Sequence, residues 1–243
     1  MLRKISKTLF KALTIGLYIS NGSVLSQTLP LSSNLIGFNT PEGEKLLFES
    51  KSNQDFFSLS MQFTTQNNQA YCGVASMVMV LNGLQIPAPE ASQYKPYRVF
   101  TQENFFSNDN TKKVLTPEVV SRQGMTLDEL GKLLSSYGVK VNVYHATDTS
   151  LEQFRKQAAE NLKQPQNFIL INYLRKEIGQ EKGGHISPVA AYNEQTDRFL
   201  ILDVSRSKYP PVWVKTTDLW KAMLTNDPAS KKSRGFVFVS KNL

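Results

Sequence analysis

The sequence contains one cysteine and two histidines among 243 residues. A single cysteine excludes an intramolecular disulfide and a zinc site built from several thiolates. The two histidines lack the spacing of a zinc protease, so we expect no metal site formed by the chain itself. Any nucleophilic chemistry based on these residue types depends on Cys72, His145 and His185.

Long apolar runs are also scarce. The run at residues 12–20 is too short to cross a bilayer as a stable helix. Four basic residues precede it and small or polar residues follow it up to Ser26, which is the pattern of a secretory signal. We therefore expect residues 1–26 to be a signal peptide and residues 27–243 to form one exported, periplasmic domain without a membrane span. An uncleaved anchor or a disordered basic tail is the alternative.

The positive charge of the chain is concentrated near its N-terminus. The formal charge is +8 at pH 7, and four of these charges lie in the expected signal, which leaves +4 for residues 27–243. No basic stripe with interleaved aromatic residues is present, so we expect no nucleic-acid partner. A mild positive balance suits a small anionic substrate.

Cys72 stands at the start of an apolar run, residues 74–84, that predicts a buried helix ending near Asn82 and Gly83. A sulfur at the positive end of a helix dipole has a lowered thiol pKa, above all beside a histidinium, and this favours the nucleophilic thiolate. The alternative is a buried thiol that acts as a small hydrophobic side chain.

The two histidines differ in their surroundings. His145 ends a strand-like run and has only Asp148 nearby, whereas His185 follows a diglycine and begins a strand-like run. A turn at residues 194–197 leads from this run to a second strand, residues 198–204, which contains Asp203. Such a hairpin can place His185 beside Asp203 at one end of the sheet. We expect Cys72, His185 and Asp203 to be catalytic, as nucleophile, base and orienting acid.

The order cysteine, histidine, acid is similar to that of papain-like cysteine enzymes. This resemblance implies an α+β fold, in which a helical part carrying Cys72 packs on an antiparallel sheet carrying His185 and Asp203. It also implies a role for Gln66, six residues before Cys72. Papain-like enzymes have an oxyanion-hole glutamine at this position, and its side-chain amide would donate, together with the Cys72 backbone N–H, to the oxygen of the tetrahedral intermediate. Otherwise Gln66 is an ordinary polar loop residue.

Three segments resemble phytochelatin synthase: residues 69–76 (QAYCGVAS), 184–188 (GHISP) and 202–214 (LDVSRSKYPPVWV). The resemblance runs from about residue 56 to residue 239. It points to the short bacterial form, which consists of the catalytic domain and lacks the cysteine-rich C-terminal region of plant relatives. It implies that Asn172, Gly184, Asp227 and Arg234 bind substrate. The alternatives are a strand-end hydrogen bond for Asn172, and surface charges or a mutual ion pair for Asp227 and Arg234.

The resemblance further implies a glutathione γ-glutamylcysteinyltransferase. Cys72 would attack the Cys-Gly bond of glutathione or of a glutathione S-conjugate and release glycine. The γ-glutamylcysteinyl acyl-enzyme would then pass to water, which is hydrolysis, or to a second glutathione, which forms a phytochelatin. No bound cofactor is implied. Cadmium or zinc ions would activate as metal–glutathione complexes, through the substrate's thiolates, and a homodimer is a compatible state.

Two other functions stay open at this point. One is a general papain-like cysteine peptidase, and the other is a non-catalytic, exported scavenger that binds thiols or metals through Cys72. Two segments also lack a clear assignment. Residues 175–182 are expected to be a mobile charged loop, and residues 88–106 either cover the site or form a surface connection.

Overall fold

The computed structural model describes residues 28–242, and the expected signal peptide, residues 1–26, lies outside the described residues. At the centre of residues 28–242 lies an antiparallel sheet of seven strands in the order β1-β6-β5-β4-β3-β7-β2. The strands are β1 Ile36–Gly37, β2 Lys140–His145, β3 Asn167–Leu174, β4 Gly184–Asn193, β5 Arg198–Ile201, β6 Val212–Lys215 and β7 Gly235–Ser240.

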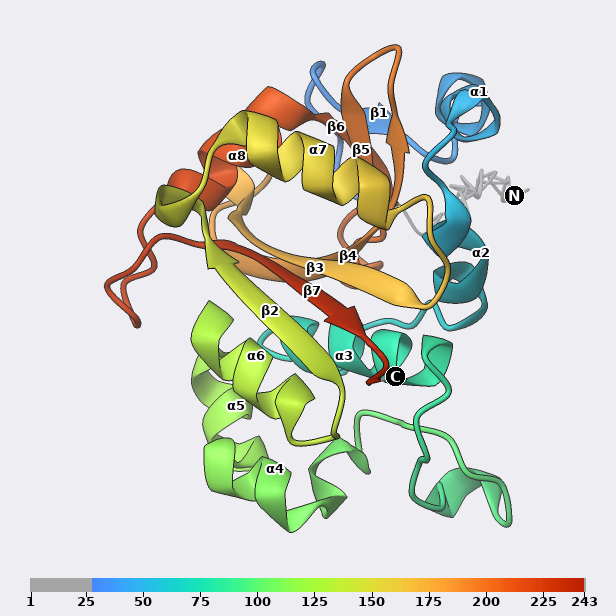
Figure 1. Ribbon diagram of the computed structural model, residues 1–243. Coiled ribbons are helices and arrows are strands. Elements are labelled where there is room, and N and C mark those ends of the chain that lie inside the picture. The colour runs from blue at the N-terminus through green and yellow to red at the C-terminus, as the bar shows by residue number, and fades with distance from the viewer. Residues whose placement is uncertain (1–27, 243) are drawn as a thin grey trace, which may run out of the picture.

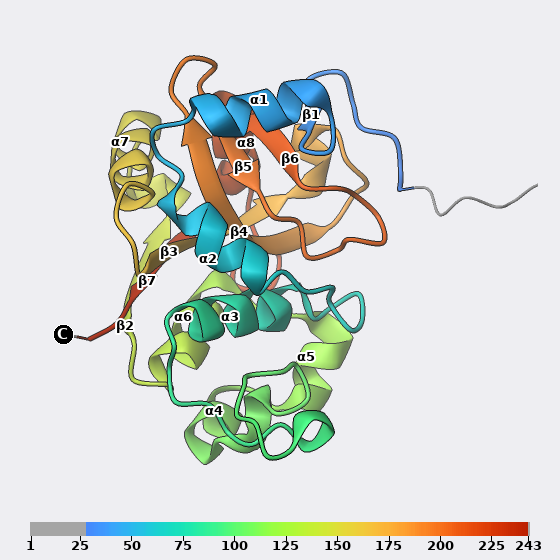
Figure 2. The same ribbon diagram turned by 90° about the vertical axis from the view of Figure 1, so that its right-hand side faces the viewer.

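Eight α-helices are found in the described part of the chain: α1 Pro41–Glu49, α2 Gln54–Met61, α3 Cys72–Gly83, α4 Asp109–Val114, α5 Pro117–Gln123, α6 Leu127–Ser135, α7 Leu151–Asn161 and α8 Thr216–Leu224. Figure 1 shows α7 and α8 on one side of the sheet and α3 to α6 on the other. The turned view in Figure 2 separates a helical part, α3 to α6, from the sheet that lies above it. None of these helices is long and apolar enough to cross a membrane.

Both faces of the sheet are covered, which explains why its central strands are mostly apolar. In β3, Phe168 and Leu170 point into the core shared with α3 and α6. Ile169, Ile171 and Tyr173 point into the core beneath α7 and α8. This alternation follows from the two-residue period of a strand. The predicted α+β class with an antiparallel sheet is therefore confirmed.

The helix that begins at Cys72 is confirmed with the predicted end, α3 Cys72–Gly83. Its first ten residues are all buried, because the helix packs between the sheet and the rest of the helical part. Gly83 suits this packing, since a Cβ atom there would approach the Phe168 ring to 2.9 Å.

The predicted hairpin is confirmed in β4 and β5, which pair antiparallel from Asn193 opposite Arg198. The second strand is shorter than expected. It ends at Ile201, so the predicted extension to residue 204 is wrong, and Asp203 lies beyond the regular strand. The backbone N–H of Leu202 still donates to the Pro188 carbonyl at 3.0 Å, which keeps Asp203 close to β4.

Candidate active site

Cys72 is the first residue of α3 and is 9% exposed. The start of α3 is joined to β4 by Ser76, whose Oγ lies 2.7 Å from the Cys72 carbonyl oxygen and 3.2 Å from the Ile186 carbonyl oxygen. This contact holds the thiol against the strand that carries His185. The helix start and the strand are thus joined by a buried side chain.

His185 lies at the beginning of β4, and its Nε2 is 2.9 Å from Asp203 Oδ1. The Ser187 hydroxyl lies at the same distance from this nitrogen. The edge of the imidazole meets the Tyr173 ring on β3, with 5.7 Å between ring centroids. Nε2 faces Asp203 and Ser187, and Cys72 is near enough for His185 to shift the pKa of its thiol.

The electrostatics of the pair favour the charged forms of both residues. Burial would raise the pKa of the Cys72 thiol, but the hydrogen bond and charge of His185, aided by the backbone of Ile186 and Gly73, bring it below its ordinary value. Burial would lower the pKa of His185, whereas the Asp203 carboxylate and the contact with Cys72 raise it. A thiolate beside an imidazolium is the reactive state of a cysteine nucleophile.

Asp203 is fully buried and forms an ion pair with Arg175, a residue that the sequence analysis did not predict for the site. Arg175 Nη1 and Nη2 donate to its two carboxylate oxygens at 2.7 and 2.8 Å, and the Ser205 backbone N–H donates at 2.8 Å. Burial would raise the pKa of Asp203, but the charges and hydrogen bonds of His185 and Arg175 hold it well below its usual range. The carboxylate therefore stays ionised beside the imidazole.

The expected loop at residues 175–182 is wrong at its start, and its mobility stays a prediction. Residues Arg175–Ile178 form a short 3-10 helix, and Arg175 is buried. Its guanidinium also donates to Gln180 and lies 5.2 Å from the centre of the Tyr209 ring. A buried ion pair requires such a fixed geometry, because an unmatched charge in the interior is costly. The sequence offered no signal for this pair beyond the presence of a charged residue after β3.

A cleft of about 820 Å³ opens beside the thiol and the imidazole. Its lining includes the four predicted substrate-binding residues, Asn172, Gly184, Asp227 and Arg234. Arg234 Nη1 donates to Asn172 Oδ1 at 2.9 Å and lies 3.6 Å from Asp227 Oδ2. The mutual ion pair considered for Asp227 and Arg234 is thus present, and both partners face the cleft.

Gly184 has a geometric reason to be glycine. A Cβ atom at this position would stand 2.7 Å from Arg234 Nη1, so a larger side chain would displace the guanidinium. β3 lies between β4 and β7 in the sheet, with Asn172 opposite both Ile186 and Gly235. This register brings Asn172, Gly184 and Arg234 to one place although they are far apart in the chain.

Gln66 is close to the site but does not line the cleft formed by the described residues. Its side-chain amide donates to the Asn68 carbonyl at 2.7 Å, and its backbone N–H donates to the Val204 carbonyl at 2.9 Å. The second bond places Gln66 next to the segment that carries Asp203. The oxyanion-hole role of Gln66 stays a prediction.

His145 belongs to a different contact. Its Nε2 lies 2.9 Å from Asp128 Oδ1, and its Nδ1 contacts the Ser233 carbonyl. Lys232 Nζ lies 2.7 Å from the other Asp128 oxygen. These bonds attach the segment before β7 to the start of α6, which positions Arg234 rather than supplying a base to Cys72.

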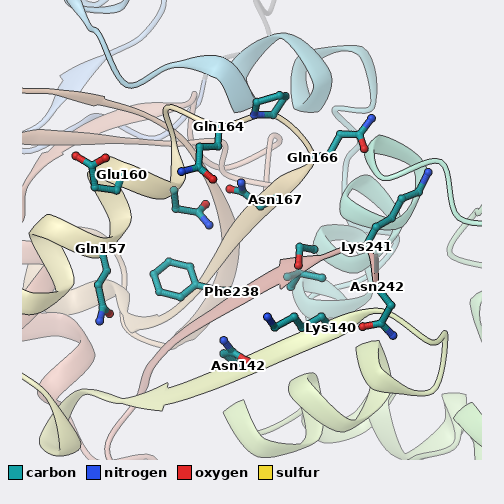
Figure 3. A pocket seen from close by; sticks show the side chains of 14 residues that line it. Lys140, Asn142, Gln157, Glu160, Gln164, Gln166, Asn167, Phe238, Lys241 and Asn242 are labelled. Carbon is teal, nitrogen blue, oxygen red and sulfur yellow. The ribbon is translucent and has the colours of Figure 1, made fainter.

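A second groove, of about 680 Å³, lies at the ends of β2, β3 and β7 beside α7. Figure 3 shows its carboxamide side chains, among them Asn142, Gln157 and Gln164, together with the ring of Phe238. It contains no cysteine or histidine and none of the predicted site residues. The chemistry expected from the sequence therefore belongs to the cleft at Cys72.

The fold and the cleft define a class: a single-sheet α+β protein with a buried cysteine–histidine–aspartate site at a helix start. The family follows from comparison of the sequence. The family model of phytochelatin synthase matches residues 26–236, so the chain belongs to the phytochelatin synthase family.

Several curated proteins are similar to this chain. Glutathione gamma-glutamylcysteinyltransferase 3 of Lotus japonicus is 32% identical over 92% of the chain and 46% of its own length. Glutathione gamma-glutamylcysteinyltransferase 1 of Arabidopsis thaliana is 34% identical over 90% of the chain and 44% of its own length. Glutathione gamma-glutamylcysteinyltransferase of Schizosaccharomyces pombe is 31% identical over 76% of the chain and 43% of its own length. The chain thus spans less than half the length of these relatives.

Proposed function

We propose that this protein is a glutathione γ-glutamylcysteinyltransferase with a papain-like fold, acting through an acyl-enzyme on Cys72. The observation that carries the proposal is that Cys72 and His185 line one cleft together with Asp227 and Arg234, while Asp203 Oδ1 lies 2.9 Å from His185 Nε2. Membership of a family whose curated relatives bear this activity in their names supports the choice of substrate.

The proposed donor, glutathione, has a γ-glutamyl end with an ammonium and a carboxylate on one carbon. Asp227 and Arg234 offer the complementary charges at 3.6 Å from each other. A guanidinium is suited to a carboxylate because it can donate two parallel hydrogen bonds. In this arrangement Asn172 and Gly184 hold Arg234 in place, and the cysteinyl carbonyl of the substrate reaches Cys72.

Acylation begins when the Cys72 thiolate attacks this carbonyl carbon, while His185 holds the proton as imidazolium. His185 then protonates the leaving glycine amine as the Cys-Gly bond breaks. A γ-glutamylcysteinyl thioester is left on Cys72, and His185 is neutral. The backbone N–H of Cys72 and the Gln66 amide are the proposed donors to the intermediate's oxyanion.

The thioester can be resolved in two ways. In hydrolysis His185 takes a proton from water, and γ-glutamylcysteine is released. In transfer it takes the proton from the α-amine of a second glutathione, and (γ-Glu-Cys)₂-Gly is released. Cadmium or zinc enters this proposal as part of the substrate, bound by glutathione thiols. S-conjugates would be cleaved by the same route.

Two further parts of the proposal rest on the sequence. The N-terminal pattern supports export to the periplasm after removal of residues 1–26. A homodimer is the second part of the proposal. Both are tested on the protein purified from the cells that naturally make it. Sequencing of its N-terminus tests removal of the signal, and its mass in solution tests the homodimer.

The function is tested by incubating the purified protein with glutathione, with and without cadmium, and following the products by mass spectrometry. We expect glycine together with γ-glutamylcysteine, (γ-Glu-Cys)₂-Gly or both. Cys72→Ala should abolish glycine release and the covalent adduct. Asp203→Asn should cut the rate by about 10⁴, the size of the effect of the same Asp→Asn change in a serine-protease triad. Asp148→Asn, which changes an exposed aspartate, is the control and should be near normal.

Other results would contradict the proposal. Turnover by the Cys72→Ala variant would remove the nucleophile. Cleavage of ordinary α-linked peptides at the same rate as glutathione would indicate a general peptidase. Stoichiometric capture of thiols or metals without turnover would indicate a scavenger.

A further inference from the structure

The two sides of the Cys72 cleft differ in whether their charged side chains have a partner within the protein. On the sheet side, Asp227 and Arg234 pair with each other. On the helical side, the Glu129 carboxylate accepts hydrogen bonds from the Thr126 backbone N–H at 2.7 Å and the Thr126 hydroxyl at 2.9 Å. Arg122, in the last turn of α5, also lines the cleft and is exposed.

The Arg122 guanidinium forms no side-chain hydrogen bond or ion pair with any residue between 28 and 242. Glu118, one turn earlier on α5, is exposed; a hydrogen bond from Thr116 and, more weakly, the Arg122 charge lower its pKa, but the two side chains form no ion pair within 4.0 Å. Among the described residues, Arg122 is therefore the cleft cation whose charge is left for a ligand. Ser121 and Gln123, its neighbours, add polar groups to the same wall.

The proposed substrate supplies a matching anion. Glutathione has two carboxylates, one at each end, and its scissile bond lies between them. When Asp227 and Arg234 bind the γ-glutamyl end and the thiol of Cys72 meets the cysteinyl carbonyl, the glycine carboxylate extends beyond Cys72. Arg122 is the unmatched cation available to it.

The leaving group and the acceptor share one chemical unit. Glycine leaves as an amine with a carboxylate on the adjacent carbon. The acceptor glutathione attacks through its α-amine, which also has a carboxylate on the adjacent carbon. Both amines must occupy the same position at the thioester carbonyl, because one bond is formed where the other was broken.

We propose that Arg122 is the carboxylate ligand of a single α-amino-acid subsite, occupied first by the glycine of the donor and then by the α-amino-acid unit of the acceptor. This inference rests on the proposed function. It has a chemical consequence in the reverse direction. Glycine can re-enter the subsite, its nitrogen bonds to the thioester carbon, the C–S bond breaks, and its proton passes to His185, so glutathione is formed again.

The experiment measures two rates in the full-length protein. The first is glycine release from glutathione and from the analogue in which glycine is replaced by glycinamide. The second is the entry of isotopically labelled glycine into glutathione. The variants are Arg122→Ala, Arg122→Lys and, as the matched control on a neighbouring helix, Lys132→Ala, which removes an exposed cation outside the cleft.

For Arg122→Ala we expect kcat/KM for glutathione to fall about tenfold or more, the usual size of a charge-assisted hydrogen bond at a binding site. Labelled-glycine exchange and transfer to a second glutathione should fall by a similar factor. The glycinamide analogue should be cleaved equally by the wild type and by Arg122→Ala, because it lacks the carboxylate. Arg122→Lys should recover part of the loss, and Lys132→Ala should match the wild type.

Three results would overturn the inference while leaving the proposed function intact. They are an unchanged kcat/KM for glutathione in Arg122→Ala, an equal loss on glutathione and on the glycinamide analogue, and a loss of transfer without a loss of glycine exchange. The last would mean that acceptor and glycine use separate subsites. If the wild type releases no glycine from glutathione, the proposed function itself fails and the inference fails with it.

Discussion

At the scale of single residues, the Cys72–His185 pair depends on a second buried pair behind it. Asp203 accepts hydrogen bonds from Arg175, His185 and the Ser205 backbone, so its charge is matched in an interior position. A lone carboxylate in such a place would take up a proton. Arg175 thereby keeps Asp203 able to orient and charge the imidazole.

The first prediction concerns the pH dependence of glycine release. In the proposed mechanism the active form holds the Cys72 thiolate and the His185 imidazolium, so kcat/KM should rise as the thiol ionises and fall as the imidazolium loses its proton. The lowered thiol pKa and the raised imidazole pKa widen the pH range between these limits. A pH profile of glycine release measures both limbs.

The variant Asp203→Asn separates the limbs of this profile. It removes the charge that raises the pKa of His185, so the alkaline limb should move to lower pH in the residual activity. Asp148→Asn is again the control and should leave both limbs in place. An alkaline limb that stays unchanged in Asp203→Asn would mean that another group titrates there.

At the scale of elements, the irregular segment at residues 88–106 is not part of the cleft lining. It contacts the loop that carries Gln66. Gln102, which is buried, accepts a hydrogen bond from the Asn67 backbone N–H at 2.9 Å and donates one to the Thr65 carbonyl at 2.8 Å. One carboxamide thus fixes the backbone on both sides of Gln66.

The second prediction follows from this contact. Gln66→Ala should lower kcat by about 10²–10³ if its amide serves the oxyanion. Gln102→Leu keeps the volume but loses both hydrogen bonds, so it should lower kcat through Gln66 with little change in KM. Combined with Gln66→Ala it should add little more, because the positioned group is already absent.

Gln93→Leu is the matched control for this experiment, since Gln93 lies in the same segment but is exposed. It should keep wild-type kcat. Fully additive losses in the double variant Gln66→Ala/Gln102→Leu would show that Gln102 acts on the fold and not through Gln66.

At the scale of the whole molecule, one core joins the helical part to the sheet, and a second core packs α7 and α8 on its opposite face. One buried group works against this stability. Asp55, on α2, is 1% exposed, and neither of its carboxylate oxygens has a hydrogen-bond partner among the described residues. Burial raises its pKa from 3.8 to about 9.

The third prediction is a pH-dependent free energy of unfolding. Below pH 3.8 Asp55 is neutral in both states and has no linkage effect. As pH rises from 3.8 to about 9, only the unfolded chain ionises it, so stability falls over this range and levels off above it. Asp55→Asn removes this loss. The variant's advantage over the wild type should grow by about 1.4 kcal/mol per pH unit above 4 and reach about 4 kcal/mol at pH 7.

Urea denaturation at pH 4 and pH 7 measures this difference. Asp109→Asn, at an exposed position, is the control and should show no comparable change between the two pH values. An Asp55→Asn variant with the same advantage at both pH values would contradict a neutral, buried Asp55.

Local patterns in the sequence were enough to predict α3, the hairpin of β4 and β5, and the order of Cys72, His185 and Asp203. They succeed because helices and hairpins are built from contacts between residues close in the chain, and hydrophobic periodicity reports those contacts directly. The family resemblance then implied substrate-binding roles for Asn172, Gly184, Asp227 and Arg234; all four line the cleft, and their roles stay predictions.

Only the tertiary structure decided which charges are buried and what matches them. The pairing of Arg175 with Asp203 spans 28 positions, and the bond between Gln102 and the loop at Gln66 spans 35 to 37. Arg234 meets Asn172 because β7 pairs with β3, two strands separated in the chain by β4 to β6. Such contacts depend on strand order and helix packing, which are set by burial over the whole chain, so no local pattern of residues records them.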